Sequence, residues 1–355
     1  MTTAEVIEKI QMGESIRESD ISGLDFSGQD LSEGRFFNVR ASGTLFPGAN
    51  LSKTFFTECD LDKAIFDNGE LERTIFYQCR MADSSFLSAR LEQARIANSD
   101  LKGAQFEQSN IGRMVFFQSL LSEASFRNIQ LRKTSFIECT FSGTRFDGAT
   151  LYKMTFTQTD LSTASFRNAR FENPIFIQTD LSGLDFSGQT LRMIQCTDGT
   201  LKGTRFAGSD ISFGNFSRSN LEGAVFDRAN AESSLFMGAN QTGISGQNAN
   251  FRMSSFQEAS AAGARFSGSD MSLCLLTQGN FSRGNFSETS IVFGDFSHTN
   301  LEEASFREAD LTRTNLHRVS DRGANYSGST RPLAKETDRE RSEAEDFSRS
   351  PQAGE

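Results

Sequence analysis

The sequence predicts an all-β solenoid, and two regularities in the spacing of its apolar residues carry this prediction. A large apolar residue recurs at nearly every fifth position from Ile16 to Tyr326, usually with a small residue two positions before it. We call these positions the centres. Phe fills most centres whose numbers end in 6, whereas Leu, Ile or Met fills most that end in 1. A period of five is neither the helical period of 3.6 nor the strand period of two, so the repeat itself decides the architecture.

Four five-residue units are enough to close a square turn of 20 residues, with one unit on each side. Adjacent turns then hydrogen-bond as parallel strands about 4.8 Å apart. The alternation of the centres places Phe on two opposite sides of the turn, where stacked aromatic rings fill the axis. When Ala, Cys and Tyr are counted as apolar, the exceptions from Ile21 onward are Gln241, Gly246 and Asp321, so the predicted core is nearly continuous.

Residues 1–15 are predicted to form an N-terminal cap that contains a short helix. Thr2 and Glu5 have the spacing of a capping box, and Val6 and Ile10 contribute to one apolar helix face. Solenoids need such a cap over their first open turn. A docking peptide is the alternative interpretation of this segment.

Residues 16–326 are predicted to form the solenoid, with a weakened joint near 231–261. The centres of this joint include four small or polar residues: Ala231, Gln241, Gly246 and Ala261. Losing large side chains from adjacent layers removes several kcal/mol of burial. Either water or inward collapse of neighbouring residues would fill the space. We expect the least stable turns here, with the fastest amide hydrogen exchange in 238–250.

Residues 327–355 are predicted to be a mostly disordered, charged tail. Pro332, Pro351 and mixed charges dominate this segment, and few large apolar residues are present. A short helix across 336–347 is the alternative. The sequence contains no obvious C-terminal cap, so the last turn must be covered by the tail, by a second copy or by a partner.

The five-residue pattern resembles the pentapeptide-repeat family, whose motif is Ala-Asp/Asn-Leu-x-x. Good copies are Ala49-Asn50-Leu51, Ser99-Asp100-Leu101, Ser219-Asn220-Leu221 and Ala309-Asp310-Leu311. The resemblance implies a right-handed quadrilateral parallel β-helix, with 20 residues per coil and about 15 coils. A family fold does not by itself define a function.

One face of the predicted solenoid is unusually apolar on its outside. It is the face whose centres include Phe36, Phe56 and Phe76, and beside it runs a column of amide and carboxylate side chains. Its outward apolar residues are Phe37, Phe55, Ile75, Tyr77, Val115, Phe117, Ile137, Ile175 and Ile177. Exposed apolar patches of this kind mark interfaces, so we expect a protein partner or a homodimer there. The alternative is that β-forming residues simply suit a flat strand.

The charge and the cysteines restrict the partners and the compartment. The net charge is -10, which argues against direct nucleic-acid binding through phosphates. No apolar run approaches the roughly 18 residues of a membrane span, and no signal-peptide core follows Met1. We therefore expect a cytoplasmic bacterial protein that does not bind membranes, with secretion left open. The five cysteines occupy core positions, and we expect reduced, buried thiols.

The sequence lacks the residues of a catalytic or cofactor site. Its two histidines, His298 and His317, are predicted to be surface residues, since a stable metal site usually needs three or four ligands. No nucleophile and base stand out, and no phosphate-binding glycine loop is present. We expect no enzyme activity, no cofactor and no metal.

Three functions follow from these observations. The first is a non-catalytic interaction scaffold or adaptor. Residues 13–28 loosely resemble repeat segments encoded beside bacterial type VI secretion genes, which implies an accessory that binds an effector or a spike component. The second is a DNA mimic that binds DNA gyrase or topoisomerase, as the resemblance to the quinolone-resistance branch implies. Frequent Arg and Lys and a charge of about -5 for the repeats depart from that pattern. The third is a secreted bacterial effector.

Overall fold

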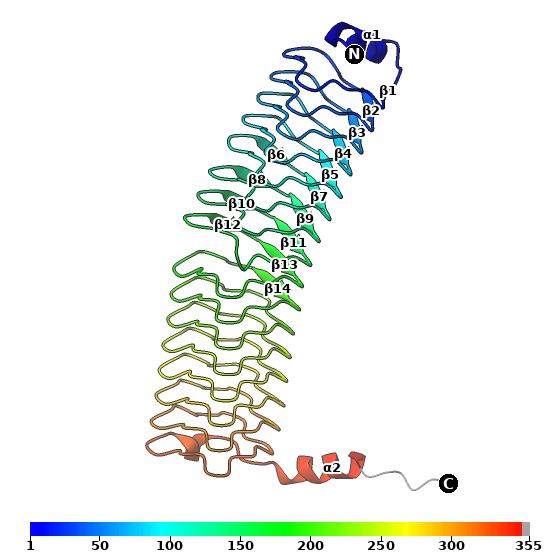
Figure 1. The fold of residues 1–355 in the computed structure, drawn as a ribbon. Helices are drawn as coiled ribbons and strands as arrows, with labels where there is room; N and C mark the ends of the chain where they lie inside the picture. The colour runs from blue at the N-terminus through cyan, green and yellow to red at the C-terminus, as the bar shows by residue number, and fades with distance from the viewer. Residues whose placement is uncertain (350–355) are drawn as a thin grey trace, which may run out of the picture. The chain divides into compact units, whose positions relative to one another are not determined.

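The computed structural model of the protein describes residues 1–349, and the chain divides into two compact units, Met1–Asp180 and Leu181–Glu355. We call them unit 1 and unit 2. In both units short strands or bridges pair in parallel with the next turn of the chain (Figure 1). The prediction of an all-β parallel solenoid is confirmed.

Unit 1 carries two parallel sheets on different sides of the coil (Figure 1). The first sheet consists of β1 (Ile16–Arg17), β2 (Arg35–Phe37), β3 (Phe55–Thr57), β4 (Ile75–Tyr77), β5 (Arg95–Ala97), β7 (Val115–Phe117), β9 (Ser135–Ile137), β11 (Thr155–Thr157) and β13 (Ile175–Ile177). The second consists of β6 (Asn110–Gly112), β8 (Gln130–Arg132), β10 (Thr150–Tyr152) and β12 (Arg170–Glu172). Unit 2 has one strand, β14 (Gln195–Thr197), and otherwise isolated parallel bridges.

Residues 20 positions apart are paired throughout both units. In unit 1, Phe36 pairs with Phe56, and in unit 2 the bridge from Asp185 leads to Arg205. We call a set of residues at this spacing a column. Because the pairing is parallel and in register, each column places like side chains beside one another in successive turns.

The centres point inward and form the core of each unit. In unit 1, Phe46 and Phe66 stack with their ring centroids 5.1 Å apart, while Phe56 meets Phe66 edge to face at 6.4 Å. In unit 2, Phe286 stacks on Phe306 at 4.9 Å. Both arrangements are favourable for aromatic quadrupoles. The predicted inward direction of the Phe centres is confirmed, since these rings are all buried.

The predicted N-terminal helix is present as α1 (Thr3–Gln11). The Thr2 side chain accepts a hydrogen bond from the Glu5 backbone N–H, and the Glu5 carboxylate accepts one from the Thr2 backbone N–H. This reciprocal pair satisfies two amides that the first helical turn leaves without partners. Val6 is fully buried against the start of unit 1, and the Thr3 hydroxyl donates to the Asp25 carbonyl oxygen.

The corners of the coil lie two residues after a centre, and nearly all of them adopt a left-handed backbone conformation. Gly43 shows φ 63° at such a corner, and Lys53 reaches φ 59° at the next corner but one. The chain reverses there through a tight turn, for example with the Thr44 N–H donating to the Ala41 carbonyl oxygen at 3.2 Å. Glycine suits this position because it has no Cβ. The corners without glycine are mostly polar.

The weakened joint keeps the regular coil but changes its packing. Gln241 is completely buried, and neither side-chain amide atom has a hydrogen-bond partner among the described residues. At Gly246 an added Cβ would meet the Phe251 ring at 2.7 Å, so this ring fills the space that a larger centre would occupy. Inward collapse is therefore the observed response at Gly246. The predicted low stability of this region stays a prediction.

The prediction of a disordered tail is wrong for residues 327–349. This segment forms a 3-10 helix, η1 (Arg331–Leu333), and the helix α2 (Arg339–Arg349), as the alternative of a short helix anticipated in part. The backbone N–H of Lys335 donates to the Thr314 carbonyl oxygen, and the backbone carbonyl oxygen of Lys335 accepts from the Leu316 N–H, each at 2.8 Å. The tail thus adds backbone partners to the last turn, whose peptide groups would otherwise lack them. Residues 350–355 lie outside the described part of the chain.

The five cysteines are free and buried, as predicted. None of the helices within residues 1–349 is both long enough and apolar enough to cross a bilayer.

Candidate functional site

The nine apolar residues predicted to bind a partner all lie on the first sheet of unit 1. They belong to β2, β3, β4, β7, β9 and β13. In each of these strands the middle residue is a buried Phe. Because successive side chains of a strand point to opposite faces, the two flanking residues point outward. The nine side chains therefore lie on the outer face of one sheet, and their binding of a partner stays a prediction.

The nine side chains differ in exposure. Phe55 and Tyr77 are about two-fifths exposed, at 40% and 41%, and Ile177 is exposed to 37%. The other six are half-buried beside their neighbours in the columns. Large aromatic side chains at such exposure can still bury substantial area against a partner. The outer surface of the sheet is therefore apolar but not fully covered by its own chain.

The register arranges these residues in two columns with different continuity. The column before the centres joins Phe55 to Ile75, but Arg95 then separates Ile75 from Val115. The column after the centres contains no charged residue between Phe37 and Ile177. It runs through Phe37, Thr57, Tyr77, Ala97, Phe117, Ile137, Thr157 and Ile177. Sequence reasoning missed the two threonines and the alanine that make this column continuous.

The two edges of this surface are polar. At its beginning the Arg17 guanidinium lies 4.1 Å from the centroid of the Phe37 ring, which is a favourable cation–π contact. Along the corner beside the second column run amide and carboxylate side chains, where Gln118 donates to Glu138 at 2.8 Å. A central apolar area with a hydrogen-bonding rim is the usual anatomy of a protein interface. We call the nine predicted residues with Thr57, Ala97 and Thr157 the apolar sheet face.

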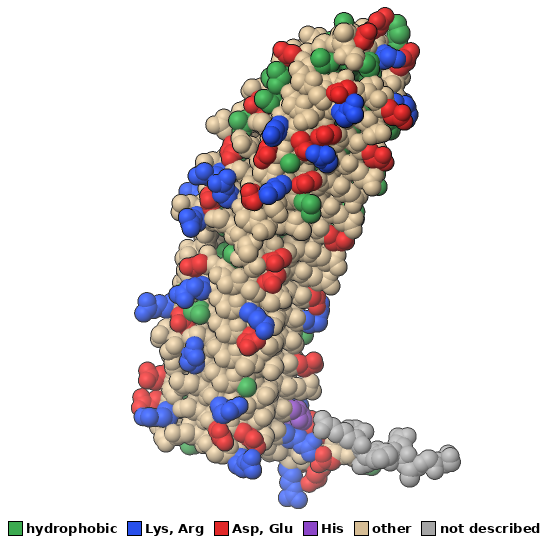
Figure 2. Space-filling model, in the orientation of Figure 1, with side chains coloured by type: hydrophobic (Ala, Val, Ile, Leu, Met, Phe, Trp, Pro, Cys, Tyr) green, Lys and Arg blue, Asp and Glu red, His purple; other side chains and the backbone are tan. Residues whose placement is uncertain are grey.

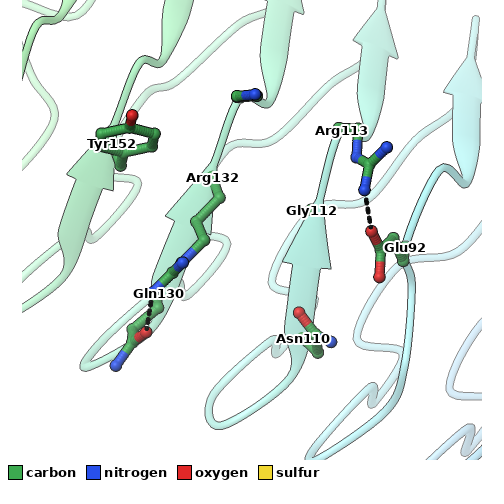
Figure 3. Close-up of a pocket in the computed structure, with 8 residues that line it drawn as sticks. Glu92, Asn110, Gly112, Arg113, Gln130, Arg132 and Tyr152 are labelled. Atoms are coloured by element: carbon green, nitrogen blue, oxygen red, sulfur yellow. Dashed lines mark hydrogen bonds and ion pairs between the residues drawn. The ribbon is translucent and has the colours of Figure 1, made fainter.

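A second surface feature lies on the other sheet of unit 1, and the sequence analysis did not find it. Side chains of β6, β8 and β10 line a depression of about 630 Å³ (Figure 3). Its lining includes Gly112, Arg132, Lys133 and Tyr152. Arg113 is held by Glu92 at 3.0 Å. The depression is basic and open to solvent, and it offers no nucleophile paired with a base.

The structure brings a third polar residue to the two histidines. The Nε2 atoms of His298 and His317 each lie 3.2 Å from the Glu345 carboxylate of α2. The prediction that both histidines are surface residues is wrong for His317, which is 1% exposed because the tail covers it. Sequence reasoning could not find Glu345, since the tail was expected to lack structure.

The hydrogen bonds of His317 decide what this cluster can do. Its Nδ1 atom accepts the Asp338 backbone N–H at 3.2 Å, so Nε2 carries the ring hydrogen and donates it to Glu345. In this tautomer Nε2 has no lone pair for a metal. Desolvation raises the pKa of Glu345, but hydrogen bonds from His317 and Arg341 outweigh it and lower that pKa to about 2. The cluster thus holds α2 against the last turns of unit 2.

Acidic and basic side chains are interleaved on the surface. Arg40 pairs with Asp20 at 3.2 Å, and Arg218 pairs with Asp198 at 2.7 Å, in each case between successive turns of one column. Figure 2 shows red and blue side chains beside one another on the visible face. Such pairs reduce the local negative field of the acidic residues.

Two sequence models of one repeat family match the chain. The one described as a pentapeptide repeat region matches residues 129–206, and the one described as pentapeptide repeats (8 copies) matches 42–78, 74–112, 199–240, 247–278 and 295–320. Together they cover more than half of the chain. No curated protein matches it.

Several solved structures are similar to the chain at low identity. HetL, a pentapeptide repeat protein involved in heterocyst differentiation regulation from the cyanobacterium Nostoc sp. strain PCC 7120, is 15% identical over 94% of this chain and 96% of its own, with a TM-score of 0.26. Full-length QnrB1, a plasmid-mediated fluoroquinolone resistance protein, is 16% identical over 73% of this chain and 98% of its own, with a TM-score of 0.20. The repeat matches, and not these structures, support the assignment of a family.

Proposed function

The chain belongs to the pentapeptide-repeat family, and we propose that it is a non-catalytic protein–protein interaction scaffold that binds a partner through the apolar sheet face. The observation that carries this proposal is the uncharged column from Phe37 to Ile177, in which Tyr77 is exposed to 41% between Thr57 and Ala97. Contiguous apolar surface on a folded protein is typical of an interface. The flat sheet suits a partner with an extended apolar surface whose edge can hydrogen-bond to the amides at the corner.

The proposal includes the finer geometry implied by the family. The pairing of residues 20 positions apart supports a coil of 20 residues, whereas the right hand and the count of about 15 coils come from the family resemblance. In such a coil the core is filled by its own side chains, as the stacked Phe columns indicate. This supports a role in binding rather than in catalysis.

The test compares two charged variants in a pull-down from the cells that produce the protein. Tyr77→Glu combined with Phe117→Glu places two charges in the uncharged column and should abolish capture of the partner, because unpaired buried charges are costly. Tyr152→Glu on the second sheet is the matched control and should capture the partner at the wild-type level. Unchanged far-UV circular dichroism shows that the variants remain folded. Full capture by the double variant would refute the proposal.

A narrower role as a type VI secretion accessory that binds an effector or a spike component, or as a secreted effector, stays a prediction. So do the cytoplasmic location and a homodimer through the same face. Mass spectrometry of the captured material separates these possibilities. Recovery of this chain alone would indicate self-association, and recovery of a secretion component would support the accessory role.

DNA mimicry is the alternative function. It requires acidic columns that stand in for phosphates, whereas Arg40, Arg80 and Arg90 each pair with an acidic residue of a neighbouring turn. This pairing weighs against mimicry. A supercoiling assay with DNA gyrase distinguishes the two functions, because a scaffold should leave supercoiling unchanged.

A further inference from the structure

Unit 2 carries a second apolar surface, and its backbone conformation sets it apart. Among the described residues, those that combine a large apolar side chain with positive φ are five in number and occupy a single column: Met193, Phe213, Met253, Leu273 and Phe293. Their φ values lie between 59° and 62°. The left-handed region is unfavourable for a bulky residue, by roughly 1–2 kcal/mol. Most other corners carry glycine or polar residues instead.

These five side chains are only about half buried within their own chain. Their exposure ranges from 39% for Leu273 to 55% for Met193. Two further exposed residues, Leu235 and Leu275, each lie two positions after a residue of this column, Ser233 and Leu273 respectively. We call these seven residues the corner ridge. A conformation that is unfavourable for bulky residues, occupied by exposed apolar side chains, points to a contact outside the chain.

The corner ridge is symmetric about Met253 only in part, because Ser233 corresponds to Leu273 and Met193 corresponds to Arg313. Met253 lies in its middle turn. Phe213 and Phe293 lie two turns before and after it, and Leu235 and Leu275 lie one turn before and after. The guanidinium group of Arg192 lies 5.3 Å from the centroid of the Phe213 ring, and that of Arg313 lies 5.3 Å from the centroid of the Phe293 ring. A two-fold contact uses the same patch on both copies, and an axis at Met253 would bring Phe213 to Phe293 and Leu235 to Leu275.

We propose that the corner ridge binds the corner ridge of a second copy of this chain, with the two coils antiparallel and a two-fold axis at Met253. Phe213 of one copy then faces Phe293 of the other, and the two Met253 side chains face each other. Methionine suits such a contact because its flexible side chain adapts to an identical neighbour.

The exposed area of the corner ridge and the charges around it are consistent with a second copy of the chain as the partner. Seven residues that are two-fifths to half exposed offer roughly 600 Å² per copy, if a fully exposed side chain of this size has about 170–200 Å². The total of roughly 1,200 Å² reaches the lower limit for specific interfaces. Arg252 of both copies lies near the axis, and Glu232 one turn earlier in the same column offsets this like charge. Arg192 and Arg313 form the ends of the contact, where charged residues remain hydrated.

Sedimentation equilibrium of the full chain over a wide concentration range tests the association. The wild type should dimerise. Met253→Lys should raise the dimer dissociation constant at least about 10-fold, because the residue lies at the axis and both copies bring the new charge to the same contact. Lysine is compatible with this backbone, because Lys53 occupies the same type of corner at φ 59°. Asn248→Lys, at another corner of the same turn with φ 54°, should leave the dimer unchanged. A wild type that stays monomeric at every concentration would overturn the proposal.

Charge exchange tests the antiparallel register. Phe213→Glu alone and Phe293→Lys alone should each weaken the dimer, whereas the double variant should recover most of the affinity because each Glu faces a Lys of the other copy. Recovery is expected only if these two residues meet. If the double variant is weaker than both single variants, the register is wrong.

A thiol crosslinker that spans a short distance tests the axis. Met253→Cys should crosslink to itself in the dimer, and Ser233→Cys should not, since Ser233 would face Leu273. The native cysteines are all buried and do not interfere. Tyr77→Glu with Phe117→Glu on unit 1 should leave the dimer intact. If this pair abolishes dimerisation and Met253→Lys does not, the dimer uses the apolar sheet face instead.

Discussion

Gln241 is a centre whose replacement should stabilise the protein. Its side chain is completely buried, and both its amide nitrogen and its carbonyl oxygen lack a hydrogen-bond partner among the described residues. Its column neighbours in the adjacent turns are Leu221 and Ala261. The change Gln241→Leu therefore removes an uncompensated amide and continues a column of aliphatic side chains.

The expected gain follows from two contributions. Burying an amide without a partner costs about 1–3 kcal/mol in proteins, and Leu adds apolar contact in a space of similar size. Since small Ala261 leaves room for the branched side chain, we expect the free energy of unfolding of unit 2 to rise by about 2–4 kcal/mol. For a unit of this size that corresponds to an increase in Tm of roughly 4–16 °C.

Thermal unfolding and native-state hydrogen exchange measure this change. Gln241→Leu should raise the Tm and slow the exchange of amides in 238–250. Gln241→Ala should change stability less, because it removes the amide but leaves a cavity. Gln105→Leu, at an exposed position, should stay within about 0.5 kcal/mol of the wild type. If Gln241→Leu does not raise stability, the amide is satisfied in solution and the reasoning is refuted.

Three further predictions concern the ends and the joint. Thr2→Ala should destabilise α1 by about 1 kcal/mol, whereas Thr2→Ser should be nearly neutral. Hydrogen exchange of the α1 amides measures this, and an equal loss of helix stability in both variants would argue against the capping box. Because the pKa of Glu345 is lowered from 4.5 to about 2 when α2 is docked, the docked helix should be fully stable above about pH 4.5 and released as the pH falls toward 2. Exchange of the α2 amides measures this, and Glu345→Gln should release the helix already at neutral pH; retention of α2 in that variant would contradict the role of the carboxylate. In the wild type, amides of 238–250 should exchange faster than those elsewhere in the solenoid of unit 2, and uniform protection would show that Phe251 restores full packing.

Short-range patterns were predicted correctly because local geometry determines them. The capping box of Thr2 and Glu5 needs only three residues of spacing, and the inward direction of Phe56 or Phe66 follows from the five-residue period. The outward position of Tyr77 follows from the same period. Features that depend on contacts between distant turns were missed. His317 appeared to be on the surface because nothing in its neighbourhood indicates that Glu345 returns to cover it.

The corner ridge shows why the outer surface was harder to predict than the core. Met193 and Phe213 are not centres of the five-residue repeat, and a single apolar residue at another position does not by itself predict an interface. Their meaning depends on the left-handed backbone at the corner and on their alignment in one column. Both are properties of the folded coil.

The repeat period by itself determined the class of fold, the buried centres and the face on which the nine apolar residues lie, because a regular spacing of large apolar side chains allows one way to bury them all. Only the tertiary structure decided how Phe251 fills the space beside Gly246, how the tail covers the last turn, and which outer side chains adjoin one another. These depend on the packing of residues 5 to 28 positions apart in the chain, for example Gly246 with Phe251 and His317 with Glu345. Such contacts produce no periodic pattern of residues in the sequence.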